Sequence, residues 1–218
     1  MIQYLERRVK FPEYFYHYKS GGHVAALHAH LQNTFFFKID VQNFYYSIAR
    51  MRVTRALRSW GYPGAGTLSK WSCVANPIAA HPQYVLPIGF VQSPILASIV
   101  LMKSDVSKAI ERAMANGVLV SVYFDDFVGS HIDEGVLRAA YIDILDTCVS
   151  AKLVPNPAKL VPPNAAIKVF NCDLTHGSAN VAAERIGKYM TSAKRSPASD
   201  VAFEQYRVLI SSANITLS

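Results

Sequence analysis

The chain is poor in charge and in cysteine, and it has no long uninterrupted hydrophobic run. Charged residues make up 17% of its 218 residues, against about 25% in ordinary globular proteins. Three widely spaced cysteines form no CxxC pair, which excludes a disulfide scaffold and indicates reduced thiols. The most apolar window, 85–102, is broken by prolines and glycine, whereas a membrane-spanning helix needs about 20 mostly apolar residues. The first ten residues lack a signal-peptide core. We therefore expect a cytoplasmic protein with no membrane partner.

Apolar residues are abundant instead, at 51%, and the net charge is +7. This apolar content excludes a disordered tail, because it can offset the entropy lost on ordering. The length suits one compact domain, or one domain plus a fragment. The basic balance indicates a polyanionic partner.

The hydrophobic pattern predicts an α+β fold. The expected strands are 34–40, 118–122, 127–128 and 167–174, and the expected helices are 24–31, 53–60, 93–116 and 137–148. The segment 61–87 is rich in turn residues and stays unassigned, and a polar segment closes the chain. Ser93-Pro94 matches an N-cap followed by proline at the first helical position. This order predicts an antiparallel sheet with helices on one face.

Three aspartates stand where the predicted strands end. Asp40 ends an apolar strand, and Asp125 and Asp126 occupy the tight turn of a hairpin. If the Asp40 strand lies beside this hairpin, the three carboxylates converge and repel one another, and divalent cations are the natural compensation. Two such ions can clamp the attacking and leaving oxygens of a phosphoryl transfer. For Asp125-Asp126 alone, a solvated hairpin turn is the ordinary alternative.

Three segments resemble motifs A, B and C of reverse transcriptases, in the required order and with comparable separations. They are 36–48 (FFKIDVQNFYYSI), 86–94 (LPIGFVQSP) and 123–126 (YFDD). In addition, 153–159 (LVPNPAK) resembles motif D, and 167–174 resembles the motif E strand. The resemblance is strongest to the bacterial retron, abortive-infection and defence-associated enzymes.

The resemblance implies a right-hand polymerase palm with reduced fingers and a truncated thumb. Residues 1–35 would be an N-terminal fingers remnant, and 36–175 the palm, with a fingers insertion at about 50–85. Residues 176–218 would begin a thumb or form a C-terminal extension. We expect RNA, a protein subunit or a second copy of the chain to supply the missing grip.

The resemblance also assigns the metal site. Asp40 and Asp125 would bind two Mg²⁺ ions, with Mn²⁺ as an alternative, and Asp126 would complete the acidic cluster. The carbonyl of Val41 would face a metal. Tyr45 stands at the steric-gate position, where an aromatic ring blocks a ribose 2′-hydroxyl and favours deoxynucleotides.

Further roles follow from the other motifs. Phe44, Gly89 and Ser93 would line the nucleotide site. Lys159 matches the motif D lysine, a candidate general acid for the pyrophosphate leaving group. Phe170 would lie near the primer grip.

The favoured function is an RNA-directed DNA polymerase that adds dNTPs to a 3′-hydroxyl in a bacterial anti-phage defence system. Its partners would be an RNA template or a structured noncoding RNA, and its product DNA. Ile88 would also line the nucleotide site, where it replaces the usual motif B glutamine. Its side chain cannot donate a hydrogen bond, so untemplated or weakly templated DNA synthesis is an alternative function. A catalytically incomplete nucleic-acid-binding subunit is the alternative of another class.

The N-terminal segment carries two further features. Its first nineteen residues interleave aromatic and basic side chains, which either stack nucleic-acid bases or dock on the core. The cations there that could serve a triphosphate are Arg7, Arg8, Lys10 and Lys19. Four histidines follow, His17, His23, His28 and His30. No cysteine is near them, and the i, i+2 spacing of the last two separates their side chains, so we expect a packing or nucleic-acid role rather than zinc.

Overall fold

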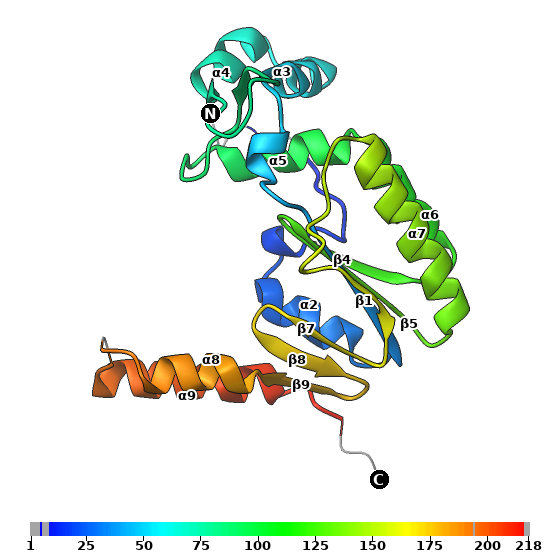
Figure 1. Ribbon diagram of the computed structural model, residues 1–218, viewed down its shortest axis with the longest axis vertical. Coiled ribbons are helices and arrows are strands. Elements are labelled where there is room, and N and C mark those ends of the chain that lie inside the picture. Colours follow the sequence, from blue (N-terminus) through cyan, green and yellow to red (C-terminus); the bar gives the residue numbers. More distant parts are fainter. Residues whose placement is uncertain (1–4, 6–8, 194, 216–218) are drawn as a thin grey trace.

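The structure is a computed structural model that describes residue 5 and residues 9–193 and 195–215. Its centre is a four-stranded antiparallel sheet with the order β4-β5-β1-β6 (Figure 1). The strands are β1 (Phe35–Asp40), β4 (Leu119–Tyr123), β5 (Asp126–His131) and β6 (Val161–Asn164). Among the described residues, none of the helices combines the length and the apolarity needed to cross a bilayer.

The alternation of side chains along β1 divides the sheet into two faces. Phe37 and Ile39 point to one face, which α6 (Asp105–Ala115) and α7 (Glu134–Ser150) cover. There the ring of Tyr141 lies 5.4 Å from that of Phe37. These two helices share one face of the sheet, but the predicted helix at 24–31 lies on the other face, so the expectation that the helices cover one face is wrong for it.

The second face of the sheet carries a smaller core. It is covered by α2 (Gly22–His30) and by a three-stranded sheet of β7 (Ala166–Val169), β8 (Cys172–Thr175) and β9 (Ser178–Val181). The single strand expected over 167–174 is therefore wrong. Phe170 and Asn171 both adopt positive φ and reverse the chain into a hairpin, a conformation that non-glycine residues seldom take.

The upper part of the molecule in Figure 1 is helical. It contains α3 (Arg50–Ser59), α4 (Ala65–Trp71) and the short pair β2 (Val74–Ala75) and β3 (Tyr84–Val85). A 3-10 turn, η2 (Tyr45–Ser47), connects β1 to this part. The elements α4, β2 and β3 fill the segment that the sequence leaves unassigned.

The long helix expected over 93–116 is two helices. The first, α5 (Ser93–Met102), ends at a break where Ser104 turns to extended backbone and donates to the carbonyl of Leu101 before α6 begins. The N-cap of α5 is Gln92 rather than the expected Ser93. The hydroxyl of Ser93 points back and donates to the carbonyl of Pro87 instead, at 2.7 Å.

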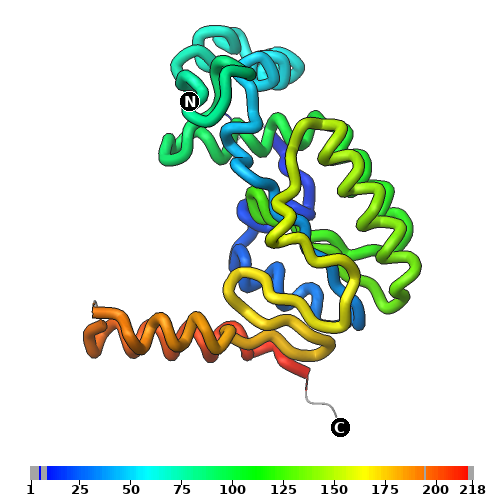
Figure 2. The backbone as a smooth tube through the Cα atoms, in the orientation of Figure 1, coloured from blue at the N-terminus to red at the C-terminus, as the bar shows by residue number. Residues whose placement is uncertain are grey.

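The C-terminal segment forms a helical pair that projects from the rest of the molecule (Figures 1 and 2). It consists of α8 (Ala183–Met190) and α9 (Pro197–Ser211), and a capping box of Ser196 and Ser199 starts the second helix. Ile210 at its end is buried against the second core. The sequence suggests only a polar segment here.

The N-terminal segment packs on the four-stranded sheet. The amide of Val122 in β4 donates to the carbonyl of Tyr14, and Phe15 bridges Val122 in parallel, just before the turn η1 (Tyr16–Tyr18). Tyr14 and Phe15 are buried in the main core. Of the two roles predicted for the N-terminal aromatic residues, base stacking and docking on the core, these two rings therefore have the second. Arg7 and Arg8 lie outside the described residues.

Candidate active site

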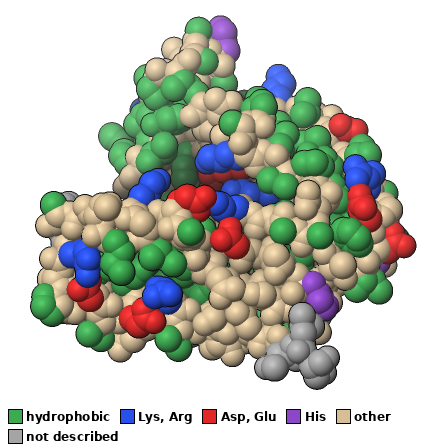
Figure 3. Space-filling model, turned by 60° about the horizontal axis from the view of Figure 1, so that its bottom comes forward, with side chains coloured by type: hydrophobic (Ala, Val, Ile, Leu, Met, Phe, Trp, Pro, Cys, Tyr) green, Lys and Arg blue, Asp and Glu red, His purple; other side chains and the backbone are tan. Residues whose placement is uncertain are grey.

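The three predicted aspartates meet at one end of the sheet. Asp40 pairs with Asp126 in the β1–β5 register, and the amide of Val41 donates to the carbonyl of Asp125 at 3.0 Å. Figure 3 shows acidic and basic side chains gathered in a hollow of the surface. The strand pairing thus produces the convergence that the sequence predicts.

Two lysines neutralise part of this acidic cluster. Asp40 is buried, and its Oδ2 lies 2.9 Å from Nζ of Lys159. Lys159 comes within reach because residues 154–156 pair with the end of β1: Gln42 donates to the carbonyl of Val154, and Asn156 donates to that of Asp40. The motif D segment is thereby tied to the motif A strand by backbone hydrogen bonds.

The second lysine, Lys38, is a site residue that the sequence reasoning missed. Its Nζ lies 2.9 Å from Oδ1 of Asp126, and the two side chains are only 13% and 19% exposed. Lys38 shares a sheet face with Asp40 because it stands two residues earlier in the strand. It is also a diagonal cross-strand neighbour of Asp126. Strand alternation was the signal that could have identified it.

The cluster remains short of positive charge. Burial raises the pKa of Asp125, and repulsion from Asp126 and Asp40 raises it further. Burial also raises the pKa of Asp126, although Lys38 opposes the shift. The hydrogen bond to Asp40 raises the pKa of Lys159. An added cation would therefore be stabilised at this edge.

The donor set suits Mg²⁺, which prefers hard carboxylate and carbonyl oxygens. Oδ1 of Asp126 is buried, and its only close partner among the described residues is the Lys38 ammonium, 2.9 Å away in an ion pair. Across the described part of the chain, no three His, Cys, Asp or Glu side chains are already arranged around a common metal position. Lys159 occupies one oxygen of Asp40, so ion binding there requires this lysine to move.

Tyr45 lies beside the acids, but Phe44 does not face a ligand. Burial and the nearby Asp125 raise the pKa of Tyr45 to about 12, so its hydroxyl stays protonated at neutral pH. The ring of Phe44 is only 5% exposed and packs in the main core. The structure therefore gives Phe44 a packing role rather than the expected contact with a nucleotide.

The motif B turn is open and apolar. Ile88 is 63% exposed and Val91 79% exposed. Between them Gly89 has φ +93°, with nothing within 4 Å of where a side chain would begin. Ser93 is buried, and its hydroxyl donates a hydrogen bond to the carbonyl of Pro87. This bond holds the turn, so the hydroxyl does not face a nucleotide.

Among the remaining predicted residues, Phe170, His17 and His23 lie against Tyr123 of the YFDD turn, residues 123–126. Phe170 lies at the β7–β8 turn, with its ring 5.4 Å from that of Tyr123. The four histidines have separate partners: His17 lies at Ser98, His23 at Tyr206, His28 at the carbonyl of Ile210, and His30 between Ser121 and Ser130. Lys19 pairs with Glu13 at 3.0 Å.

The antiparallel sheet with an acidic edge defines the palm of a nucleic-acid polymerase. Residues 1–163 match the family described as reverse transcriptase (RNA-dependent DNA polymerase). The chain therefore belongs to the reverse transcriptase family. A search of curated proteins gives no match.

Solved structures with a similar fold come from the same class of polymerases. A foamy viral protease-reverse transcriptase in complex with double-stranded DNA has a TM-score of 0.52 and 17% identity over 83% of this chain and 28% of its own. A foamy viral protease-reverse transcriptase with an RNA/DNA hybrid has a TM-score of 0.51 and 16% identity, over 82% of this chain and 22% of its own. Telomerase from Candida albicans with a fragment of telomeric RNA has a TM-score of 0.53 and 12% identity, over 80% of this chain and 35% of its own. The chain thus spans about a third or less of the length of these proteins.

Proposed function

We propose that this chain is an RNA-directed DNA polymerase that extends a 3′-hydroxyl with deoxynucleotides. The observation that carries the proposal is the meeting of Asp40, Asp125 and Asp126 at one sheet edge, where burial and mutual repulsion raise the pKa of two of them. Membership of the reverse transcriptase family supports the same reaction.

In this proposal Asp40, Asp125 and the carbonyl of Val41 hold two Mg²⁺ ions. Bound there, the ions lower the charge repulsion between the attacking 3′-oxygen, the α-phosphate and the leaving pyrophosphate. Asp126 stays paired with Lys38 and contributes negative charge next to the ligands. Burial of Asp40 limits competition by water for its oxygens.

Lys159 and Tyr45 would act on the nucleotide. Lys159 is the more exposed partner of its ion pair, at 55% against 5% for Asp40, so it can swing from the carboxylate to a pyrophosphate oxygen and donate a proton there. Tyr45 presents a neutral hydroxyl and a half-buried ring beside Asp125. In the proposal this ring excludes a ribose 2′-hydroxyl.

Exposure of Ile88 supports a contact between the motif B turn and the template or the incoming base. An apolar contact of this kind positions a base by shape rather than by a directed hydrogen bond. The proposal therefore includes relaxed selection among nucleotides. Synthesis without a template remains the second candidate, favoured by this one residue.

The likeness of motifs A to C to the bacterial defence-associated enzymes supports anti-phage defence as the setting of the proposed activity, with a structured RNA as its proposed template. Phage plating on bacteria that express the wild type or Asp125→Asn tests this setting. Protection by the wild type alone supports it, and equal plating on both strains overturns it.

Primer extension on the full chain tests the activity itself. An RNA template with a DNA primer, dNTPs and Mg²⁺ is incubated with the protein, and the products are sequenced. Complementary DNA supports the proposal. Products unrelated to the template favour untemplated synthesis, and absence of any extension overturns both.

A further inference from the structure

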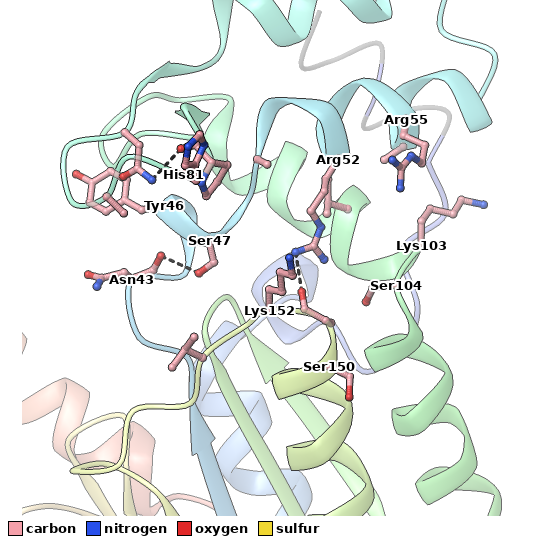
Figure 4. Close-up of a pocket in the computed structure, with 18 of the residues that line it drawn as sticks. Asn43, Tyr46, Ser47, Arg52, Arg55, His81, Lys103, Ser104, Ser150 and Lys152 are labelled. Carbon is pink, nitrogen blue, oxygen red and sulfur yellow. Dashed lines mark hydrogen bonds between the residues drawn. The ribbon is translucent and has the colours of Figure 1, made fainter.

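A large cavity lies behind motif A, outside the acidic edge. Its volume is about 1130 Å³, and its walls come from η2, α3, the α5–α6 junction and the end of α7. One end begins at Gln42 and Asn43, directly after the metal-facing Val41. In Figure 4 Arg52 points from α3 toward the loop that carries Lys152, and Arg55 lies on the side of the α5–α6 junction, where Lys103 and Ser104 are. None of the proposed catalytic side chains lines this cavity.

Four cations line the cavity, namely Arg52, Arg55, Lys103 and Lys152. The only acidic side chain among the lining residues, Asp105, is engaged by Lys108 at 2.8 Å. Among the described residues, no ion pair involves any of the four cations. The cavity therefore holds positive charge that no carboxylate of the described residues pairs with. One of the four ammonium and guanidinium groups, that of Lys103, lies over the ring of Trp60, 4.7 Å from its centre.

The guanidinium of Arg52 is held in a position where its positive charge is unfavourable. Its guanidinium donates to the carbonyl of Ala151 at 3.0 Å, which fixes the side chain in the cavity. Burial and repulsion from Arg55 lower its pKa. A ligand with negative charge would relieve both effects.

Size and wall chemistry indicate what kind of anion fits. Pockets for small molecules hold about 300–1,000 Å³, so this cavity has room for more than one nucleotide. Tyr46 and His81 lie together on the wall opposite the cations (Figure 4) and offer ring faces, and Asn43 and Asn76 offer amides. Basic grooves with interspersed rings are typical of single-strand binding.

We propose that this cavity binds a single-stranded nucleic-acid segment outside the primer–template duplex. The cations contact its phosphates, and the rings of Tyr46 and His81 stack on its bases. The segment would enter next to motif A, so that an RNA held here stays attached beside the catalytic edge. The proposal concerns binding and does not depend on polymerase activity.

Fluorescence anisotropy of a labelled ten-nucleotide RNA tests this site on the full chain, with the duplex cleft first saturated by a blunt RNA/DNA hairpin. The test variant is Arg55→Gln/Lys152→Gln. The matched control is Arg58→Gln/Lys188→Gln, which removes the same charge from exposed positions that do not line the cavity. We expect the test variant alone to lower the slope of log affinity against log salt by about 1.4, since each phosphate contact of a single strand contributes about 0.7.

Two outcomes would overturn the proposal. One is an equal loss in both variants, which would mean that net charge alone binds the RNA. The other is displacement of the RNA by a nucleoside triphosphate at equal concentration through the same residues, which would make the cavity a mononucleotide site.

A second inference concerns His17 and rests on the proposed function. Its Nδ1 lies 3.3 Å from the amide nitrogen of Phe124 and 3.3 Å from the carbonyl oxygen of Val122, and its Nε2 lies 2.9 Å from the hydroxyl of Ser98. That hydroxyl donates to the carbonyl of Pro94. Phe124 has φ +56° and directly precedes Asp125. The ring of His17 packs 4.3 Å from that of Phe124.

We infer that His17 is a positioning residue that holds the strained YFDD turn against the start of α5. Burial lowers the pKa of His17 to about 4, so the neutral ring needed for this chain of hydrogen bonds is present at neutral pH. The link connects motif C to motif B through the N-terminal segment.

Steady-state primer extension by His17→Phe, His17→Asn and the control His28→Phe tests this role. We expect His17→Phe to keep the melting temperature and the KM for dNTP but to lower kcat about tenfold, the effect of about 1.4 kcal/mol. His17→Asn, which keeps an acceptor for the Phe124 amide, should recover part of the loss. An unchanged kcat, or a loss equal to that of His28→Phe, would overturn the inference; inactivity of the wild type would instead be a failure of the proposed function.

Discussion

The ion pair between Lys38 and Asp126 lies in the wall of the acidic edge, and its removal has a calculable effect. Lys38→Met keeps the apolar stem that packs along the strand but removes the ammonium. The carboxylate of Asp126, 19% exposed, then loses its countercharge. Removing one partner of a buried pair costs about 3–5 kcal/mol, and partial exposure places this pair near the lower figure, about 3 kcal/mol.

The loss should depend on pH. The pKa of Asp126 is already raised in the folded protein by burial, and Lys38 holds it down. Without Lys38 that pKa rises further. A raised carboxyl pKa means that the folded state binds more protons than the unfolded chain, so the free energy of unfolding falls as pH rises from the ordinary 3.8 through the folded pKa. The destabilisation by Lys38→Met should therefore be small at pH 4 and complete at pH 8.

Urea denaturation followed by tryptophan fluorescence measures this effect. Lys108→Met is the matched control, because Lys108 and Asp105 form a pair of similar length that is 69% and 76% exposed, so water screens it and its loss should change stability little. The double variant Lys38→Met/Asp126→Asn should recover most of the lost stability. The reasoning is refuted if Lys38→Met costs no more than Lys108→Met, or costs the same at pH 4 and pH 8.

Three further predictions follow from the core and the site. Gly129→Ala should lower the free energy of unfolding by about 3 kcal/mol, because its Cβ would lie 2.2 Å from the buried ring of Phe37. The control Gly66→Ala, whose Cβ would have nothing within 4 Å, should not lower it. Equal urea midpoints of the two variants would contradict this prediction. Asp125→Asn should melt at a higher temperature than the wild type in Mg²⁺-free buffer at pH 7, because it removes a carboxylate whose pKa is raised. Mg²⁺ should raise the melting temperature of the wild type alone. A lower melting temperature of Asp125→Asn without Mg²⁺ would contradict the charge repulsion between the three aspartates. Burial lowers the pKa of His30 to about 3, so the wild type should lose stability as pH falls from 6.5 toward 3. In melting temperatures measured over that pH range, His30→Gln should lose less. An equal fall in the melting temperatures of both proteins would exclude His30 as the cause of the acid destabilisation.

The palm elements and the acidic edge could be predicted from local patterns. An apolar run that ends at Asp40 predicts β1, and a β-rich run followed by Asp125-Asp126 predicts the hairpin that brings the acids to the same end. The helix α7 follows from the spacing of its apolar residues. These signals are local, because each element buries one face and its turn residues stand next to it in the sequence.

The parts that could not be predicted depend on contacts between distant segments or on unusual backbone. The β7–β8 turn uses positive φ at Phe170 and Asn171, where glycine would have given a signal. The partners of His17 lie 81 and 107 residues away. The helices α8 and α9 have much of their surface exposed, and Ile210 is the one buried residue in the two of them, so the core dictates little of their sequence. The basic cavity arises only where η2, α3, α5 and α7 meet.

Primer extension by acid variants tests the central claim most directly. Asp40→Asn, Asp125→Asn and the exposed control Asp146→Asn are compared with the wild type on an RNA template with Mg²⁺, after circular dichroism has shown equal folding. The account predicts that the wild type and Asp146→Asn extend the primer and that the other two variants do not. Continued extension by Asp125→Asn at the wild-type rate would contradict it.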